Sequence, residues 1–287
     1  MRIGVVFPQT EIGADGSGVR AYAEAAEALG YTHLLAYDHV LGADPSVHEG
    51  WAGPYDLHTD FHEPFVLFGY LAAFSRLELV TGIIILPQRQ TALVAKQAAE
   101  VDILTSGRLR LGVGLGCNAV EYEALGKPFG DRGRRAEEQI ELLRRFWTEP
   151  SVTFEGKSER VIGAGLSPMP VQRPIPIWLG ASSERALIRA GRLGDGWFPQ
   201  VSPGHGLEQA KAVLDKAARD AGRDPDAIGM EGRVTFDGEE DRLGEQVRRW
   251  EGAGATHLSV NTMGSGREGA GSHIDAIARA SEVIKAR

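Results

Sequence analysis

The sequence is poor in cysteine, in long apolar runs and in positive charge. One cysteine in 287 residues excludes a disulfide framework and a cysteine-rich zinc site, and it is typical of a reducing compartment. No segment approaches the ~18 consecutive apolar residues of a membrane-spanning helix. The 39 acidic residues outnumber the 31 basic ones, which argues against a general nucleic-acid or membrane-surface binder. Because Arg2 is followed directly by a strand-like segment, we expect no secretory leader and a cytoplasmic protein.

Glycine, by contrast, is abundant. The chain has 37 glycines in 287 residues, well above the usual share of about 7%. The hydrophobic content of 43% is enough for a sizeable core and excludes intrinsic disorder. The length fits either two domains or one α/β barrel, since such barrels often reach ~250 residues as a single domain.

Strand-like and helix-like segments alternate along most of the chain. The strand-like segments are residues 3–7, 32–36, 77–86, 109–113, 175–179, 196–199, 228–236 and 257–261. The helix-like segments are residues 19–29, 63–74, 92–104, 134–147, 182–193, 207–221, 241–252 and 274–285. Alternating units predict a parallel sheet covered by helices, and eight of them at this length favour a closed (β/α)8 TIM barrel over an open doubly wound sheet.

The alternation breaks between residues 151 and 174. Residues 152–156 and 161–162 are typical of the two arms of a β-hairpin, and a proline-rich connector follows them. We interpret this segment as a short inserted hairpin or flap, at about residues 150–174, on a single domain that spans residues 1–287. A second irregular segment, residues 37–62, predicts a long polar loop.

Active sites of (β/α)8 barrels lie at the C-terminal face, where the strands end. His39 ends a strand there, so it is a candidate general acid or cofactor contact, or else a structural hydrogen-bonding group. The other histidines of the polar loop are irregularly spaced, and we expect no metal site. Gly114 and Gly116 end another strand and fit G-x-G-x-x-A, either as a tight turn or to let a planar or phosphorylated ligand approach the backbone.

Two further segments are candidates for holding an anion. Gly180, Ala181 and Ser182 lie between a strand and a helix, where backbone N–H groups and serine hydroxyls bind a phosphate or simply cap the helix. Arg132 precedes a long helix, either as part of a solvated charged face or as a phosphate anchor. Cys117, beside the glycine turn, is interpreted as a small space-filling residue.

Several motifs carry a family resemblance. Among them are Leu-Ala-Tyr-Asp-His-Val at 35–40 and Gly-Arg-Leu-Arg-Leu-Gly-Val-Gly at 107–114, and the others lie at residues 80–89, 95–102, 121–122, 132–134, 174–180 and 194–197. With these motifs the sequence resembles the luciferase-like flavin and deazaflavin oxidoreductases, and within them the F420-dependent LLM-class branch. The motifs are specific for the superfamily and much less specific for the cofactor.

The resemblance implies a (β/α)8 barrel whose mouth holds an isoalloxazine-type ring. A non-prolyl cis peptide, which costs about 3–4 kcal/mol, is expected at Gly82–Ile83, where Thr81, Gly82 and Ile83 would support one face of the ring. The other cofactor-binding residues that it implies are Gly114, Gly116, Asn118, Arg132, Gly180, Ala181, Ser182 and Trp197. His39 would lie beside the reactive face as a proton donor, with Glu63 as a second, weaker catalytic candidate.

These expectations lead to a first hypothesis, an oxidoreductase that transfers a hydride between F420 and a small organic substrate. An alternative uses reduced FMN, which a separate reductase would supply, to hydroxylate a small organic substrate with O2. A third hypothesis is a flavin- or F420-binding protein without turnover. A lyase or isomerase barrel is disfavoured, because no barrel-strand lysine lies where a Schiff base would need it. The family alone suggests a homodimer, and we expect neither nucleic acid nor a membrane as partner.

Overall fold

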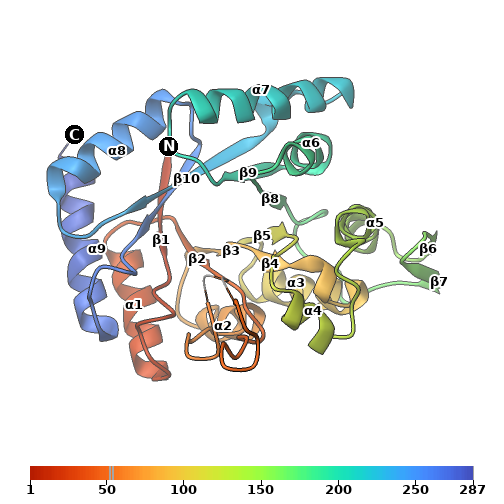
Figure 1. Cartoon of the computed structure of the whole chain (residues 1–287), viewed down its shortest axis with the longest axis horizontal. Helices are drawn as coiled ribbons and strands as arrows, with labels where there is room; N and C mark the ends of the chain where they lie inside the picture. The colour runs from red at the N-terminus through yellow and green to blue at the C-terminus, as the bar shows by residue number, and fades with distance from the viewer. Residues whose placement is uncertain (52, 54, 287) are drawn as a thin grey trace.

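Parallel strands close into an eight-strand barrel in the computed structural model, which describes residues 1–51, 53 and 55–286 (Figure 1). In pairing order the ring consists of β3 (Glu78–Thr81), β2 (His33–Ala36), β1 (Arg2–Val6), β11 (His257–Asn261), β10 (Gly229–Thr235), β9 (Gly196–Pro199), β8 (Ile177–Ala181) and β5 (Leu109–Gly114). Pairing of β3 with β5 closes the ring. The predicted (β/α)8 barrel is therefore confirmed. Two residues of the predicted polar loop, Ala52 and Pro54, lie outside the described residues.

Helices cover the outside of the barrel (Figure 1). They are α1 (Gly16–Ala28), α2 (Pro64–Leu71), α3 (Thr91–Leu104), α4 (Ala119–Ala124), α5 (Arg132–Thr148), α6 (Glu184–Leu193), α7 (His205–Asp220), α8 (Glu240–Gly252) and α9 (Gly269–Lys285), with short 3-10 turns η1 (Leu86–Gln88) and η2 (Pro225–Ala227). Side-chain caps fix where several of them begin: Asp15 accepts from the Ser17 amide at α1, and Ser183 from the Ala186 amide at α6. Helix α4 was not predicted, since it has only six residues.

The strands separate two apolar clusters. Val6, Leu35, Val80, Trp178 and Phe198 form a small cluster inside the barrel. The much larger main core lies between the strands and the helices. Because side chains alternate along a strand, neighbouring residues of one strand enter different clusters.

Charged side chains fill the barrel interior nearer the N-terminal ends of the strands. Glu231 of β10 lies 3.0 Å from His33 Nε2, 2.5 Å from Arg110 Nη1 and 2.5 Å from the Ser259 hydroxyl. The Arg110 guanidinium also stacks 4.3 Å from the centre of the Trp178 ring. Burial alone would raise the pKa of Glu231, but Arg110 and His33 hold it well below its usual range. This group, the ionic floor, ties β2, β5, β10 and β11 together from inside.

The prediction of one continuous strand over residues 77–86 is wrong. β3 ends at Thr81, and the chain re-enters the sheet only as β4 (Ile84–Ile85), which pairs with β5 before η1 begins. The break falls at Gly82, where a Cβ would lie 2.1 Å from the Leu35 side chain of β2, so this close approach favours glycine where β3 ends.

The prediction of a non-prolyl cis peptide at Gly82–Ile83 is also wrong. Among the described residues, the cis peptides are the two prolyl bonds Ser167–Pro168 and Arg173–Pro174. The Gly82 amide donates to the Ala36 carbonyl at 2.7 Å, so the chain leaves β3 with its ladder hydrogen bond intact and a trans peptide.

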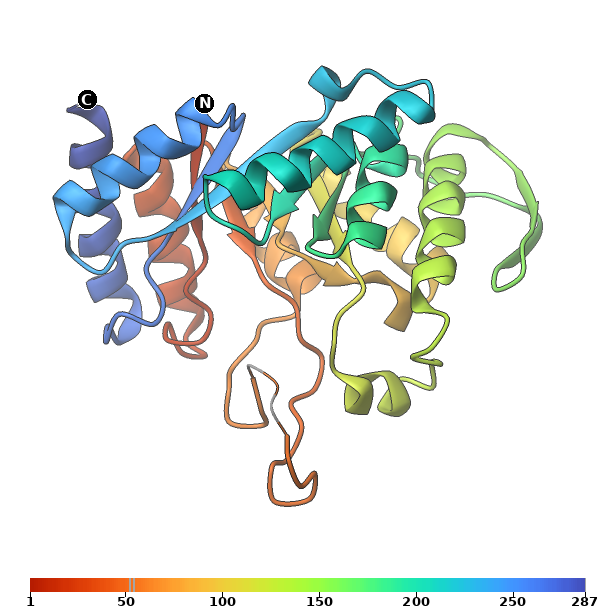
Figure 2. The same cartoon turned by 45° about the horizontal axis from the view of Figure 1, so that its top comes forward.

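Two excursions leave the barrel. The expected hairpin is present as the antiparallel pair β6 (Val152–Glu155) and β7 (Arg160–Ala164), whereas a single domain over residues 1–287 stays a prediction. The described residues of the 37–62 loop (orange) project on the same side of the barrel as α4, as Figure 2 shows. No helix within the described ranges is long and apolar enough to cross a membrane.

Candidate functional site

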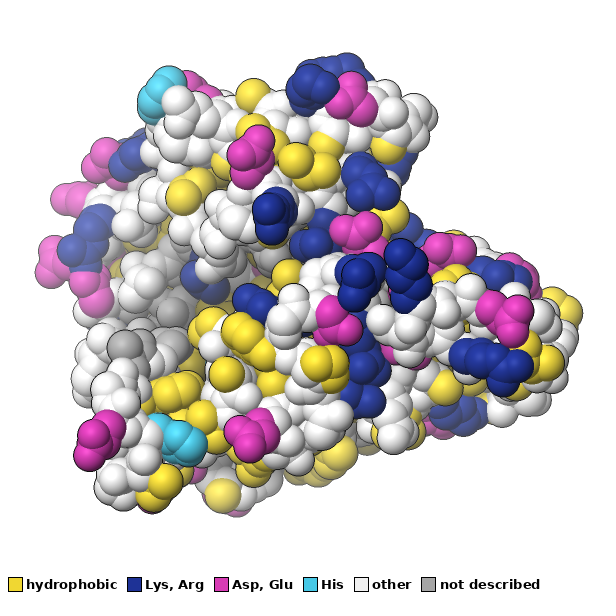
Figure 3. Space-filling view, turned by 45° about the vertical axis from the view of Figure 1, so that its right-hand side comes forward, with side chains coloured by type: hydrophobic (Ala, Val, Ile, Leu, Met, Phe, Trp, Pro, Cys, Tyr) yellow, Lys and Arg dark blue, Asp and Glu magenta, His cyan; other side chains and the backbone are white. Residues whose placement is uncertain are grey.

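A cavity of about 1040 Å³ opens at the C-terminal ends of the strands. Figure 3 shows a broad hollow on one face of the molecule, with Lys or Arg side chains at its margin. The predicted site residues that line the cavity are His39, Gly82, Ile83, Gly114, Gly116, Arg132, Gly180, Ala181 and Ser182. The structure thus brings predicted residues from five separate segments of the chain together around one cavity.

Ile83 forms an apolar wall of the cavity, packed beside Gly114 and Gly180. A Cβ at Gly114 would lie 2.4 Å from the Ile83 side chain, and one at Gly180 would lie 3.4 Å from it. The space left by these two glycines is therefore taken by Ile83, which itself faces the cavity. A flat hydrocarbon surface of this kind suits a planar ring.

The N-terminus of α6 forms a cradle for an anion. Ser183 caps the helix, while the Ser182 hydroxyl is exposed and has no hydrogen-bond partner among the described residues. Arg132 lies in the same cavity, donates to the Phe129 carbonyl at 2.7 Å and leaves its buried Nε without a partner. A helix N-terminus, a free hydroxyl and an unsatisfied guanidinium together fit the phosphate of a cofactor.

His39 is held on three sides. Its ring packs edge-on against Tyr55 and Phe61, with centroids 5.1 and 4.8 Å away. Its Nδ1 lies 3.7 Å from Oε2 of Glu121, a fully buried carboxylate on α4. In the described part of the chain Nε2 has no hydrogen-bond partner, and the ring lines the cavity. One ring nitrogen of His39 is therefore free of described protein partners in a ring that lines the cavity.

Glu121 is the residue that sequence reasoning missed. It accepts hydrogen bonds from the Val40 amide at 2.5 Å, the Leu41 amide at 3.3 Å and the Gln88 side chain at 3.0 Å. Burial alone would raise its pKa, but His39, Gln88 and the Val40 amide outweigh that effect and lower it. The carboxylate therefore stays charged and fixes the segment that carries His39.

Glu63 lies outside the cavity, so the structure does not place it where a catalytic group would act. Its carboxylate caps α2 by accepting from the Val66 amide at 2.8 Å, and it pairs with Arg89 at 3.2 Å. Arg89 also contacts Asp38 at 2.8 Å. Burial raises the pKa of Asp38, and Arg89 opposes this rise. Glu63 thus belongs to an ion-pair network behind the site.

Three predicted cofactor contacts also face away from the main cavity. The Thr81 hydroxyl is buried and bonds to both the amide and the carbonyl of Gly112, each at 2.7 Å. Trp197 is 2% exposed, lies in the main core and donates to the Ala181 carbonyl, because the strand alternation turns Phe198 into the barrel instead. Asn118 caps α4 and lines only the smaller pocket described next.

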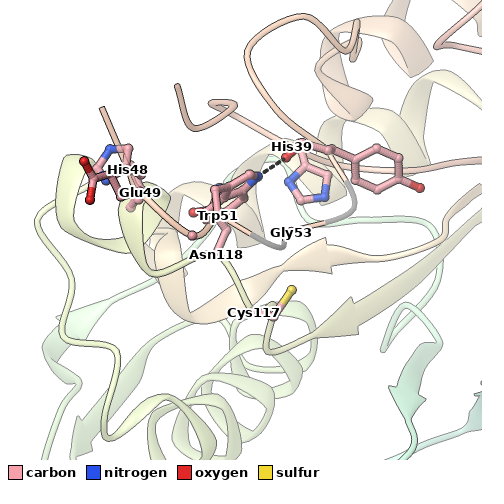
Figure 4. Close-up of a pocket in the computed structure, with 10 residues that line it drawn as sticks. His39, His48, Glu49, Trp51, Gly53, Cys117 and Asn118 are labelled. Carbon is pink, nitrogen blue, oxygen red and sulfur yellow. Dashed lines mark hydrogen bonds between the residues drawn. The ribbon is translucent and has the colours of Figure 1, made fainter. Parts of the chain in front are cut away.

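A second pocket of about 410 Å³ adjoins the first and shares His39, Tyr55 and Cys117 with it. Figure 4 shows His39, Trp51 and Cys117 around this pocket, where the Trp51 indole donates to the Tyr55 carbonyl at 3.2 Å. Cys117 is exposed, which corrects its interpretation as a space-filling residue. The aromatic lining and the shared histidine suit a small organic molecule next to a bound ring.

The fold and the site define a (β/α)8 barrel of the kind that carries out chemistry at its C-terminal face. The sequence matches the profile of the luciferase-like monooxygenase family over residues 1–282. The chain therefore belongs to the luciferase-like monooxygenase family, as the sequence motifs predicted.

Known relatives include enzymes with two different cofactors. The chain is 33% identical over 262 residues to the uncharacterized protein Rv0940c of Mycobacterium tuberculosis, covering 86% of this chain and 87% of that protein. It is 31% identical over 238 residues to the F420-dependent glucose-6-phosphate dehydrogenase of Intrasporangium calvum, covering 78% and 67%. It is 36% identical over 162 residues to the FMNH2-dependent dimethylsulfone monooxygenase of Pseudomonas fluorescens, covering 55% and 43%. A solved F420-dependent secondary alcohol dehydrogenase shares the fold, with a TM-score of 0.78, 17% identity and coverage of 99% and 98%.

Proposed function

We propose that the protein is an oxidoreductase that transfers a hydride between coenzyme F420 and a small organic substrate. The observation that carries the proposal is one open cavity with the α6 anion cradle, the Ile83 wall and His39 around it. The F420-dependent relative matches 78% of this chain and the FMNH2-dependent one 55%, which favours F420.

Each of these features has a separate task in the proposed reaction. F420, when bound, supplies a hydride donor or acceptor, and the chain supplies orientation and proton transfer. Ile83 and the α6 cradle would hold the ring and its phosphate at fixed positions. His39 Nε2 would give a proton to the substrate atom that becomes negative, or take one in the reverse direction. The aromatic residues around the smaller pocket would keep water away from the reacting atoms.

The alternative is an FMNH2-dependent monooxygenase that hydroxylates a small organic substrate. One observation favours keeping it: the FMNH2-dependent relative has the higher identity within its matched segment, 36% against 31%. In that case a separate reductase would supply the reduced flavin. The cradle and the Ile83 wall suit either cofactor, so the choice between them needs a binding measurement.

We expect purified apoprotein to bind F420 at micromolar concentration, followed by fluorescence quenching. The Ser182→Asp variant should bind about tenfold more weakly or worse, because a carboxylate at a helix N-terminus repels a phosphate. Ser202→Asp, at an exposed position outside the cavity, is the matched control. FMN binding without any F420 response would overturn the F420 assignment, and an unchanged Ser182→Asp variant would overturn the cradle.

We also propose a homodimer formed through the neighbouring helices α2 and α3. Val66 on α2 is 71% exposed and Leu93 on α3 is 52% exposed, although both are apolar. Light scattering should give a dimer for the native protein and a monomer for Val66→Glu. Ile162→Glu, on the hairpin strand β7, is the control and should leave the mass unchanged; a native monomer would contradict the proposal. A cytoplasmic location likewise stays a prediction, which cell fractionation can check.

A further inference from the structure

The charges that line the main cavity are unevenly paired. Each of its carboxylates has partners within the described chain: Asp38 contacts Arg89, Glu231 belongs to the ionic floor, and Glu11 accepts from the Gly264 amide and faces His273. Its two arginines, Arg132 and Arg233, form no ion pair with any described carboxylate. In a chain with a net charge of −8, this cavity therefore has unpaired positive charge in two places.

Arg233 is oriented without being neutralised. Its Nη1 donates to the Tyr37 hydroxyl at 3.0 Å, and its guanidinium carbon lies 5.7 Å from the centre of that ring. Only one of its five N–H donors thus has a described protein partner. Tyr37 is itself fixed, because Gln9 bonds to its carbonyl at 3.1 Å and to its amide at 3.2 Å. Burial raises the pKa of Tyr37, so it remains a neutral phenol beside Arg233.

The two arginines lie at different parts of the barrel mouth. Arg132 begins α5, which follows β5, and it shares its side of the ring with the α6 cradle that follows β8. Arg233 lies on β10, and its partner Tyr37 follows β2, two residues before His39. Strand β9 separates β10 from β8 in the ring. Arg132 is therefore placed for the cofactor phosphate, and Arg233, beside the Tyr37 hydroxyl, for a second anion at a different part of the mouth.

We propose that Arg233, oriented by Tyr37, binds the anionic group of the substrate, so that the substrate class is small organic carboxylates or phosphate esters. This inference rests on the proposed function, because it assigns the reacting molecule to the cavity that His39 also lines. The guanidinium would bind the anion through two parallel N–H donors, as arginine does with carboxylates and phosphates. It would hold the substrate by its charged end and leave the other end free to react.

Inorganic phosphate is the probe for this site, measured by calorimetry on the full chain with and without saturating F420. We expect the apoprotein to bind phosphate at both arginines and the F420-loaded protein to bind it only at Arg233. In the loaded protein, Arg233→Met should weaken phosphate binding at least roughly tenfold, since it removes a charge-assisted contact. Tyr37→Phe should weaken it by a smaller factor, because the guanidinium stays but loses its orientation. Arg219→Met, at an exposed position on α7 outside the cavity, is the matched control.

The outcomes separate the possible sources of the anion. If F420 abolishes all phosphate binding, Arg233 holds an anionic group of the cofactor, and the proposal is wrong. Unchanged phosphate binding in a folded Arg233→Met protein also overturns it. If neither F420 nor FMN binds but apoprotein phosphate binding falls in Arg233→Met, the proposed function fails while the anion site stands. Should Arg233→Met not fold, Tyr37→Phe gives the same test, because an unchanged affinity there contradicts the orienting role.

Discussion

His39→Ala is expected to lower turnover by about 10²–10⁴-fold while F420 still binds, because a positioned proton donor contributes a factor of this size. The reason is geometric: Nδ1 faces Glu121 at 3.7 Å, and Nε2 has no described protein partner where the ring lines the cavity. Single-turnover oxidation of reduced F420, with a panel of small conjugated acceptors that includes carboxylates, measures the rate directly.

The loop offers a matched control for this experiment. His58 belongs to the same loop and is exposed, but it lines neither pocket. His58→Ala should therefore keep both turnover and F420 affinity. A His39→Ala protein that binds F420 and turns over at the native rate would remove the catalytic role and leave His39 as a structural residue.

Glu121→Ala is expected to destabilise the fold by roughly 2–5 kcal/mol and to lower turnover as strongly as His39→Ala. The change leaves the Val40 amide, the Leu41 amide and the Gln88 side chain without their acceptor. A buried unmet donor costs about 1–3 kcal/mol, and the two amides cost less because they are only partly buried. Denaturant unfolding measures the first effect, and the single-turnover assay measures the second in protein that remains folded.

Glu121→Gln separates the packing role of Glu121 from its charge. Gln88 Oε1 is buried without a partner, so rotation of the Gln88 amide would let it accept from the side-chain amide that this substitution introduces. We expect this variant to fold almost as stably as the native protein at pH 7 but to lose the negative charge that faces His39. If Glu121 positions His39 through that charge, the pH profile of turnover should shift, whereas a purely structural residue would leave it unchanged.

The native protein and Glu121→Gln should also differ in stability at acidic pH. The pKa of Glu121 lies below its ordinary value of 4.5, so the ionised carboxylate stabilises the fold above that pH. This contribution is lost as the pH falls through the lowered pKa. As the pH falls below 5, the free energy of unfolding of the native protein should therefore decrease more than that of Glu121→Gln, which has no carboxylate to protonate at this position.

Short apolar runs alternating with helix-like segments predicted most of the barrel, because strands covered by helices outside and packed inside are buried on both faces. The exception, residues 77–86, shows where that information ends. Its apolar residues predict one strand, but β3 ends at Thr81, next to Gly82, whose close contact with Leu35 comes from 47 positions earlier in the chain. Helix α4 was missed for a related reason, since six residues contain too little periodicity to be distinguished from a loop.

The candidate site was predictable where it follows from strand ends and not where it follows from contacts across the chain. His39, Gly114 and Ser182 could be predicted to lie at one face because each ends a strand or follows its end by at most three residues. Whether Trp197 or Phe198 points into the barrel depends on the pleat of β9, which the sequence of four apolar residues does not reveal. The role of Glu121 depends on its hydrogen bond from the Val40 amide, 81 positions earlier in the chain. The motif that contains Glu121 was recognised, but this contact could not be read from the sequence.

The ionic floor has a consequence for how this protein can diversify. Arg110, Glu231 and His33 hold the strands together from inside the barrel, and no described side chain from residues 40–62 takes part. The loop that lines the smaller pocket can therefore vary without loosening the closure of the barrel. Natural drift, or a mutant library confined to that loop, can change which molecules are accepted while the scaffold beneath keeps its stability.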